Sequence, residues 1–149
     1  MKSHLNKHFY KICIIGGGMT GAIMALLLKK SNLFDVNEIA WVVPKLKIQN
    51  DLRTTFYNQT SVELLDRLGI FQDLKKKHFT TVKRIEVFGQ KNASPLIWNY
   101  FNSEESFGAV IENKSMLDAI LKQLDGIKKF ETIVTNTTYN EFERTLYLQ

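Results

Sequence analysis

The chain has 149 residues and a net charge of +5 at pH 7, and 44% of its residues are hydrophobic. This length and composition exclude wholesale disorder and a collagen-like structure, and they predict one domain that buries a real core. One cysteine and three scattered histidines exclude a disulfide framework and offer no metal-ligand spacing, so we expect no metal site.

The positive charge comes mostly from lysine, and the four arginines form no stripe interleaved with aromatic residues. We therefore expect no nucleic-acid partner. A basic chain is nevertheless attracted loosely to anionic lipid surfaces, so peripheral contact with a membrane stays open.

Residues 12–28 carry no charge over 17 positions, which is the lower limit for a transmembrane helix. A membrane anchor or a signal sequence is one interpretation. Three consecutive glycines at 16–18 disfavour it, because each costs a helix about 1 kcal/mol, and no small-residue cleavage site follows. We instead predict a strand over 10–15 that is buried on both faces, a glycine turn, and a helix over 19–30.

A second strand is predicted over 38–43, so that strand, helix and strand form a βαβ unit. Residues 44–58 are expected to be a loop. A helix then begins at Thr60, where Thr60 and Glu63 make the pattern of a capping box, and Gly69 marks its C-terminal end. The lysine run 75–77 that follows is typical of a solvated helix end rather than of a binding patch.

The hydrophobic period changes after this helix. Short alternating segments predict a largely antiparallel sheet with strands at 82–88, 96–100 and 108–111. An amphipathic helix is predicted over 114–124, because apolar residues recur on one face and a glycine follows. The last predicted elements are two strands, at 130–134 and 142–148, joined by a polar turn.

The glycine turn carries the main functional signal. Residues 16–21 read Gly-Gly-Gly-Met-Thr-Gly and match G-x-G-x-x-G between a predicted strand and a predicted helix. Gly16 permits the tight turn, Gly18 lets a pyrophosphate approach the backbone, and Gly21 lets the helix pack close to the strand. The anion would then lie at the helix N-terminus. The alternative is a turn that binds nothing. The predicted cofactor-binding residues of this segment are Gly16, Gly17, Gly18, Met19, Thr20 and Gly21.

One part of the dinucleotide pattern is missing. An acidic residue usually ends the second strand and hydrogen-bonds the adenosine ribose. Here the strand ends in Val42 and Val43, and Pro44 follows. Asp35 and Glu38 lie before the strand, at its wrong end. The ribose contact must come from elsewhere, or the affinity for a dinucleotide is reduced.

Two further segments carry a family resemblance. Asp51-Leu52-Arg53-Thr54-Thr55 precedes a predicted helix that ends in Leu68-Gly69, and Ile111-Glu112-Asn113-Lys114 leads into the second amphipathic helix. Together with the glycine motif, these segments resemble the FAD-dependent aromatic hydroxylases of ubiquinone biosynthesis, relatives of para-hydroxybenzoate hydroxylase, over essentially the whole chain. The resemblance implies an α/β fold, with a Rossmann-like FAD-binding βαβ unit and an inserted, mainly antiparallel sheet.

The resemblance also implies roles for single residues. Gly16, Gly18 and Gly21 would hold the FAD pyrophosphate, and Arg53, the arginine of the D-x-R segment, would lie along the FAD. A lone arginine can offer a planar fork to a phosphate, and its alternative is a solvated loop residue. Lys114 falls where many relatives carry a cofactor-contacting arginine; it keeps the charge but loses the bidentate geometry. On the first strand, Cys13 is expected to be a small buried hydrophobe.

The resemblance also has a consequence for length. Family members are far longer and carry two further FAD motifs that this sequence lacks, so we expect the chain to be a truncated N-terminal part. We assign residues 1–80 and 112–149 to the FAD-binding portion and residues 81–111 to the start of the substrate-side sheet. Much of the isoalloxazine and substrate site would then be missing.

Three functions follow. In the first, the chain is part of a monooxygenase in which FAD, reduced by NAD(P)H, reacts with O₂ and hydroxylates a prenylated phenol or quinone precursor, and a second chain supplies the missing half. No side chain is an obvious acid or base, so no catalytic residue is named. In the second, the chain is a remnant that binds FAD weakly or not at all. The third is a NAD(P)-binding Rossmann module, which leaves the D-x-R segment unexplained.

Localisation follows from the absence of a convincing export signal. We expect a cytoplasmic protein, peripheral to the inner membrane if its substrate is prenylated.

Overall fold

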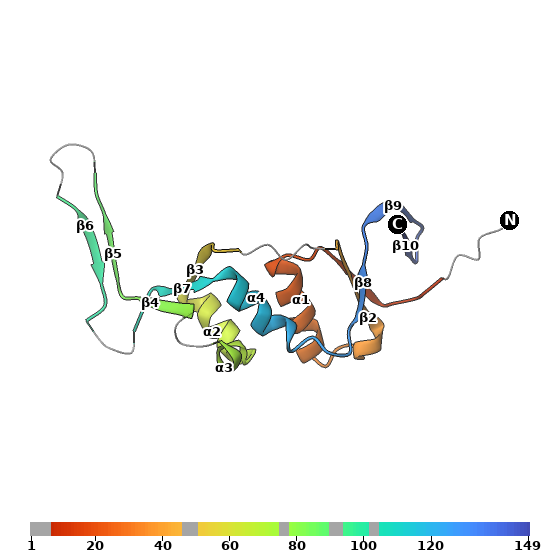
Figure 1. Cartoon of the computed structure of the whole chain (residues 1–149), viewed down its shortest axis with the longest axis horizontal. Helices are drawn as coiled ribbons and strands as arrows, with labels where there is room; N and C mark the ends of the chain where they lie inside the picture. The colour runs from red at the N-terminus through yellow and green to blue at the C-terminus, as the bar shows by residue number, and fades with distance from the viewer. Residues whose placement is uncertain (1–6, 46–50, 75–77, 90–93, 102–104) are drawn as a thin grey trace. The chain divides into compact units, whose positions relative to one another are not determined.

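The computed structural model describes residues 7–45, 51–74, 78–89, 94–101 and 105–149 (Figure 1). The chain divides into two compact units. Unit one comprises residues 1–49 and 120–149, and unit two comprises residues 50–119. These units are defined by packing within the chain, whereas the predicted division into residues 1–80 and 112–149 against 81–111 is defined by contact with FAD or substrate. The predicted division therefore stays a prediction.

Unit one is built on a parallel sheet. Its strands are β1 (Ile12–Ile15), β2 (Ile39–Val43) and β8 (Lys128–Glu131), in the order β1-β2-β8. Helix α1 (Met19–Lys30) connects β1 to β2 through the short 3₁₀ helix η1 (Val36–Glu38) and contacts both strands. The predicted βαβ unit is confirmed, with α1 at its predicted bounds.

The core of unit one lies between α1 and β2. All five residues of β2 are buried, because the strand has a neighbour on each side and apolar side chains throughout. Helix α1 buries residues at i, i+3 and i+4, which form one helical face: Ala22, Ala25 and Leu26.

Strand β1 differs from the prediction that it would be buried on both faces. Its residues alternate between half-buried and exposed, and Ile15 is 58% exposed. Cys13 is exposed as well, so its assignment as a buried hydrophobe is wrong. The exposed residues stand at alternate positions, so one face of β1 is partly covered and its other face is not covered by the described residues.

The C-terminal strands also differ from the prediction. Strand β8 ends before residue 132, and the expected polar turn is the threonine-rich strand β9 (Val134–Tyr139). It pairs antiparallel with β10 (Arg144–Leu148). Threonine suits an exposed pleated surface, which an apolar pattern cannot reveal. The Asn140 side chain closes this hairpin by accepting the backbone N–H groups of Phe142 and Glu143.

Unit two contains the predicted antiparallel pairing. Strands β3 (Thr54–Asn58), β7 (Gly108–Glu112) and β4 (Phe79–Val82) form a sheet in the order β3-β7-β4. Strands β5 (Arg84–Val87) and β6 (Leu96–Asn99) form a separate hairpin. The predicted strand over 82–88 is thus divided between β4 and β5.

Three helices complete the described elements. They are α2 (Gln59–Arg67), α3 (Ile70–Asp73) and α4 (Asn113–Leu121). Helix α4 is shorter than the predicted helix over 114–124. In unit two the buried apolar side chains come from α2, α3, β7 and α4, and they are Leu65, Leu68, Ile70, Leu74, Ala109, Ile111, Met116 and Ala119. The lysine run 75–77 lies outside the described residues.

Strand β3 corrects the predicted loop over 44–58. Its side chains are mostly exposed, so it has no buried alternating pattern to find. It exists because each of its residues pairs with β7, which lies about fifty residues later in the sequence. A pairing of this kind is a tertiary contact and cannot be read from local propensity.

The start of α2 also differs from the prediction. The N-cap is Asn58, whose side-chain oxygen accepts the backbone N–H of Ser61 at 2.9 Å, so the predicted capping box at Thr60 is wrong. The predicted end is correct, because Gly69 follows the helix with a left-handed φ of 72°.

Among the described residues, no helix combines the length and the apolar character that crossing a membrane would require.

The capping difference predicts a difference in stability between two variants. Asn58→Ala leaves an N–H of the first turn without its partner and should lower the free energy of unfolding by about 1 kcal/mol. Thr60→Ala removes a side chain with no capping role and should change it by less than about 0.5 kcal/mol. Urea unfolding followed by circular dichroism measures both. Equal losses, or a larger loss for Thr60→Ala, would contradict the assigned N-cap.

Candidate functional site: the glycine turn and the β3–β7 end

The glycine turn lies between β1 and α1 in unit one. Gly16 has a φ of +124°, a conformation that favours glycine, and its N–H donates to the Val42 carbonyl at 2.9 Å. Gly18 is the N-cap residue of α1 and offers no side-chain cap, and the first turn holds no acidic residue. The Gly18 carbonyl accepts the backbone N–H of Ala22 at 3.0 Å. The helix therefore presents its positive dipole end without a carboxylate of its own.

The space around the turn separates the roles of two glycines. A Cβ built on Gly18 would meet no atom within 4 Å, so the backbone there is open to a ligand. A Cβ built on Gly21 would overlap the carbonyl oxygen of Gly16. Gly21 is thus required for close packing of α1 on the turn, which is the role the sequence motif predicts. In the same first turn, Met19 is half-buried and Thr20 is exposed.

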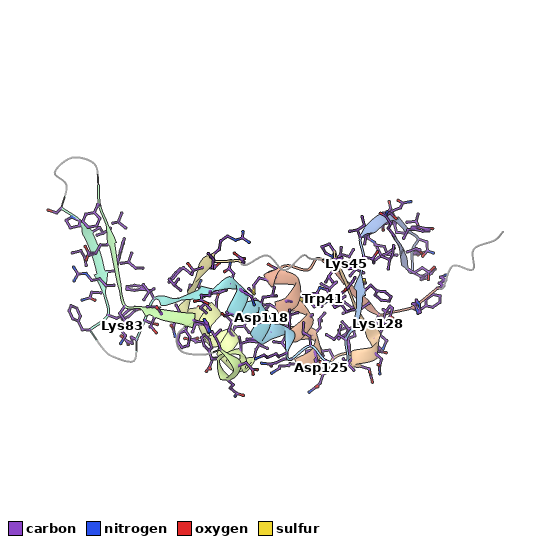
Figure 2. The ribbon with its side chains drawn as sticks, in the orientation of Figure 1. Trp41, Lys45, Lys83, Asp118, Asp125 and Lys128 are labelled. Atoms are coloured by element: carbon purple, nitrogen blue, oxygen red, sulfur yellow. The ribbon has the colours of Figure 1, made fainter. Side chains whose placement is uncertain are left out.

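Trp41 is a residue of this site that the sequence interpretation did not single out. It lies on β2 and is 3% exposed (Figure 2). Its indole Nε1–H donates to the Gly16 carbonyl at 2.7 Å. The sequence did offer one signal for this contact, a single tryptophan in a strand that is otherwise aliphatic. A buried indole N–H needs an acceptor, so a tryptophan at this position indicates a hydrogen bond to a neighbouring segment.

The carboxyl end of the parallel sheet lacks the expected acid on β2. Pro44 and Lys45 follow the strand. Glu38 lies at the other end, where its Oε1 is 2.7 Å from Lys11 Nζ. A carboxylate is present on the neighbouring strand, because Glu131 of β8 is paired in register with Val43.

Glu131 interacts with two lysines, Lys129 by a hydrogen bond and Lys45 by its charge. Its Oε1 accepts from Lys129 Nζ at 2.8 Å, and this bond, with the charges of Lys129 and Lys45, keeps the pKa of Glu131 below its ordinary value. The side chain is therefore ionised at neutral pH and contributes negative charge at this end of the sheet.

Arg53 lies in unit two, immediately before β3. Its Nε and Nη2 donate to the two carboxylate oxygens of Asp51 at 2.8 and 2.9 Å, so the pair is bidentate. The Arg53 side chain is 81% exposed. The pKa of Asp51 falls to about 2, first because of this hydrogen bond from Arg53 and then because of the Arg53 backbone N–H. The guanidinium has a fixed orientation but remains open to solvent.

Lys114 is brought to the same end of the β3–β7 pair. Asn113 donates its N–H to the Arg53 carbonyl at 3.0 Å, and its side-chain Oδ1 accepts from Thr55 Oγ1 at 2.7 Å. Lys114 follows directly at the start of α4, and its Nζ donates to Asp118 Oδ2 at 2.6 Å. Unit two thus places two predicted cofactor-binding cations, Arg53 and Lys114, on neighbouring segments, each paired with a carboxylate.

The geometry of the glycine turn predicts a large loss of stability for one alanine variant and a small one for another. Gly21→Ala places a Cβ against the Gly16 carbonyl and should lower the free energy of unfolding by about 1–3 kcal/mol. Gly18→Ala adds a methyl group in open space, so it should cost only the preference of the N-cap for glycine over alanine, at most about 1 kcal/mol. Thermal and urea unfolding measure both. A Gly21→Ala variant as stable as the natural chain would show that the turn does not pack as described.

The Asp51–Arg53 pair predicts a pH dependence. The folded pKa of Asp51 is about 2, below the ordinary value of about 3.9, so its stabilising contribution is fully present above about pH 4 and is lost as the pH falls through about 2. Carboxyl ¹³C NMR should show this midpoint and its return toward the ordinary value in Arg53→Gln. Lys114→Gln is the matched control and should leave it unchanged. An ordinary midpoint in the natural chain would contradict the bidentate pair.

Comparison with known proteins supplies the family context. No family model matches the chain. The chain is 26% identical, over 171 aligned positions, to the mitochondrial ubiquinone biosynthesis monooxygenase COQ6 of Dictyostelium discoideum. The match covers 93% of this chain and 32% of that protein. The chain therefore spans about a third of the length of the relative.

Solved structures share the fold. PqsL of Pseudomonas aeruginosa matches with a TM-score of 0.70 at 16% identity, over 90% of this chain and 36% of its own. The p-nitrophenol 4-monooxygenase PnpA of Pseudomonas putida matches with a TM-score of 0.69 at 14% identity, over 94% and 36%. HpxO of Klebsiella pneumoniae, solved with FAD and uric acid, matches with a TM-score of 0.64 at 15% identity, over 91% and 34%.

These matches bear on the predicted fold class and on the predicted resemblance. The mixed α/β fold, with its βαβ unit and antiparallel sheets, is confirmed. In sequence the chain is similar to a ubiquinone biosynthesis monooxygenase, and its fold matches about a third of the length of PnpA and of HpxO, so the predicted resemblance is confirmed.

Proposed function

We propose that this chain forms the part of a flavin-dependent monooxygenase that binds the FAD pyrophosphate, and that the enzyme hydroxylates a prenylated phenol in ubiquinone biosynthesis. The observation that carries the proposal is the open glycine turn at the uncapped N-terminus of α1. It occurs in a chain similar to a ubiquinone biosynthesis monooxygenase.

The turn fits a pyrophosphate by its shape and by its charge. An anion can approach Gly18 because no side chain or neighbouring atom fills the space. The helix dipole and the N–H groups of the first turn, with Gly17, Met19 and Thr20, favour negative charge at that point. The fit is weaker at the ribose, since Lys45 rather than an acid follows β2. We expect the ribose contact to come from another residue, and Glu131 offers the carboxylate nearest in the sheet order.

Arg53 and Lys114 are proposed as further cofactor contacts. The Asp51 carboxylate holds two of the Arg53 nitrogens and leaves Nη1 for a phosphate or a flavin oxygen. Lys114 would act as a point charge, after exchanging its contact with Asp118. Both assignments rest on the family motif and on the exposure of the two side chains in unit two.

When bound, FAD would supply the redox chemistry by which NAD(P)H and O₂ support hydroxylation of an electron-rich ring. The residues of this chain bind and orient the cofactor. The relative is about three times as long, so we propose that the flavin and substrate sites of the whole enzyme include further polypeptide.

Residues 81–111 are proposed to begin the substrate side. The β5–β6 hairpin has one wholly apolar face, made by two cross-strand pairs, Ile85 with Trp98 and Val87 with Leu96. The other face carries the Arg84–Glu86 ion pair. An apolar face suits a prenylated ring. Since such a substrate resides in a membrane, we propose peripheral work at the inner-membrane surface from the cytoplasmic side, which the charge of +5 would assist.

The proposal predicts a flavin spectrum that depends on Gly18. The purified chain, incubated with FAD and desalted, should retain visible flavin absorption. Gly18→Asp should lose it, because a carboxylate would occupy the open space and repel the pyrophosphate. Gly18→Ala should lose part of the flavin, and less than Gly18→Asp loses, because its methyl group enters the same space without adding a negative charge.

Two outcomes would contradict this proposal. A folded natural chain that retains no flavin would favour a remnant without cofactor. Binding of NAD(P)H but not of FAD, measured separately by equilibrium dialysis, would favour a nicotinamide-binding module instead.

A further inference from the structure

Strand β2 binds both polar backbone groups of Gly16. The Gly16 N–H donates to the Val42 carbonyl at 2.9 Å, and the Gly16 carbonyl accepts from the Trp41 indole at 2.7 Å. The first contact belongs to the backbone and is available to any residue at position 42. The second depends on the side chain at position 41, which is buried in the sheet. The orientation of the Gly16 carbonyl therefore depends on one indole N–H group.

The peptide that follows Gly16 is the one most in need of such a constraint. It joins Gly16 to Gly17, so neither flanking residue has a Cβ to oppose rotation of the peptide plane. In a planar trans peptide the C=O and N–H groups point in opposite directions. Holding the Gly16 carbonyl against Trp41 thus directs the Gly17 N–H away from the indole. A flipped peptide would present a carbonyl oxygen where an N–H had been.

The packing around this carbonyl is tight. Gly21, in the first turn of α1, lies so close that an added Cβ would overlap the Gly16 oxygen and would come within 3.5 Å of the indole nitrogen. The oxygen is therefore enclosed between the helix and β2, where water cannot easily replace a lost donor. An enclosed carbonyl without a donor is costly, so removing the indole N–H favours rearrangement of the turn.

We propose that Trp41 is a positioning residue of the glycine turn: its indole N–H fixes the Gly16–Gly17 peptide so that the turn offers N–H groups, and not a carbonyl oxygen, to a pyrophosphate. The inference rests on the proposed function, since it concerns how the same site receives its anion. It explains why a tryptophan stands in a strand whose other residues are aliphatic.

The test compares three variants of the full chain for binding of FAD and of ADP, which carries the pyrophosphate without the flavin. Trp41→Phe keeps an aromatic ring but removes the N–H, and it should weaken both ligands by about tenfold, the loss expected for one hydrogen bond of the site. Ile39→Ala removes buried atoms from the far end of the same strand and leaves the indole bond, so it should lower the melting temperature with little change in affinity. Trp98→Phe, on β6, should change neither the melting temperature nor the affinity for FAD and ADP.

A second measurement reads the turn directly. With ¹⁵N-glycine labelling, ADP should shift the Gly17 amide resonance of the natural chain, and Trp41→Phe should reduce that shift. The indole N–H of Trp41 should exchange with solvent more slowly than that of Trp98, which is 44% exposed. This exchange experiment needs no variant, so it applies even if Trp41→Phe does not fold.

The outcomes separate the inference from the proposed function. If the natural chain binds neither FAD nor ADP, the proposed function fails and the positioning role fails with it. If the natural chain binds both and Trp41→Phe binds them equally well, the positioning role alone is overturned. Fast exchange of the Trp41 indole N–H in the presence of ADP also overturns it.

Discussion

Strand β2 has a partner on each side, and its five residues are buried without exception. It is the central strand of the parallel sheet, and within the part of the chain that the structure describes β1 and β8 each pair with β2. Its backbone and its single indole also bind Gly16. The apolar side chains of Ile39–Val43 therefore pack against α1, whereas the Val42 carbonyl and the Trp41 indole N–H bind the glycine turn. One strand thus contributes both to the apolar core and to the polar contacts of the turn.

Strand β7 has the same place in unit two. It pairs with β3 and β4, and it leads directly into α4. The antiparallel register of β3 and β7 is what brings Arg53 to Asn113 and Lys114, residues that are far apart in the sequence. Each cation then has a carboxylate partner, and this restrains a long side chain before any ligand arrives. For Arg53 the bidentate contact lowers the side-chain entropy that remains to be lost on binding, whereas Lys114 would first have to exchange its contact with Asp118.

The sequence predicted the parts of the fold that are set by local pattern. Helix α1 was placed at its exact bounds because Gly18 precedes it and an uncharged run ends at Lys29 and Lys30. Strands β2, β6 and β7 were found from short apolar runs. Strands β3 and β9 were missed, since both are mostly exposed and owe their extended form to pairing with β7 and β10. The exposure of Cys13 could not be predicted either, because it depends on which face of β1 the rest of the fold covers.

The sequence predicts those residues of the candidate site that belong to a recognisable motif. Glycines at 16, 18 and 21 imply their roles at a strand-to-helix turn, and the structure separates open space at Gly18 from close packing at Gly21. Trp41 stands in no motif, and the D-x-R motif that contains Asp51 assigns a role only to its arginine. Their contribution comes from contacts, one across the sheet and one across two residues of an extended segment. Contacts of this kind become visible only when the backbone is in place.

The exposure of Cys13 has a practical consequence. The chain has a single cysteine, and it lies on β1 three residues before Gly16. A thiol-reactive spin label or fluorophore would therefore attach at one position, beside the glycine turn, without any engineered substitution. Partial burial raises the pKa of the Cys13 thiol, so labelling should proceed faster at mildly alkaline pH than at neutral pH. A label attached at Cys13 would therefore report on the strand that leads into the turn.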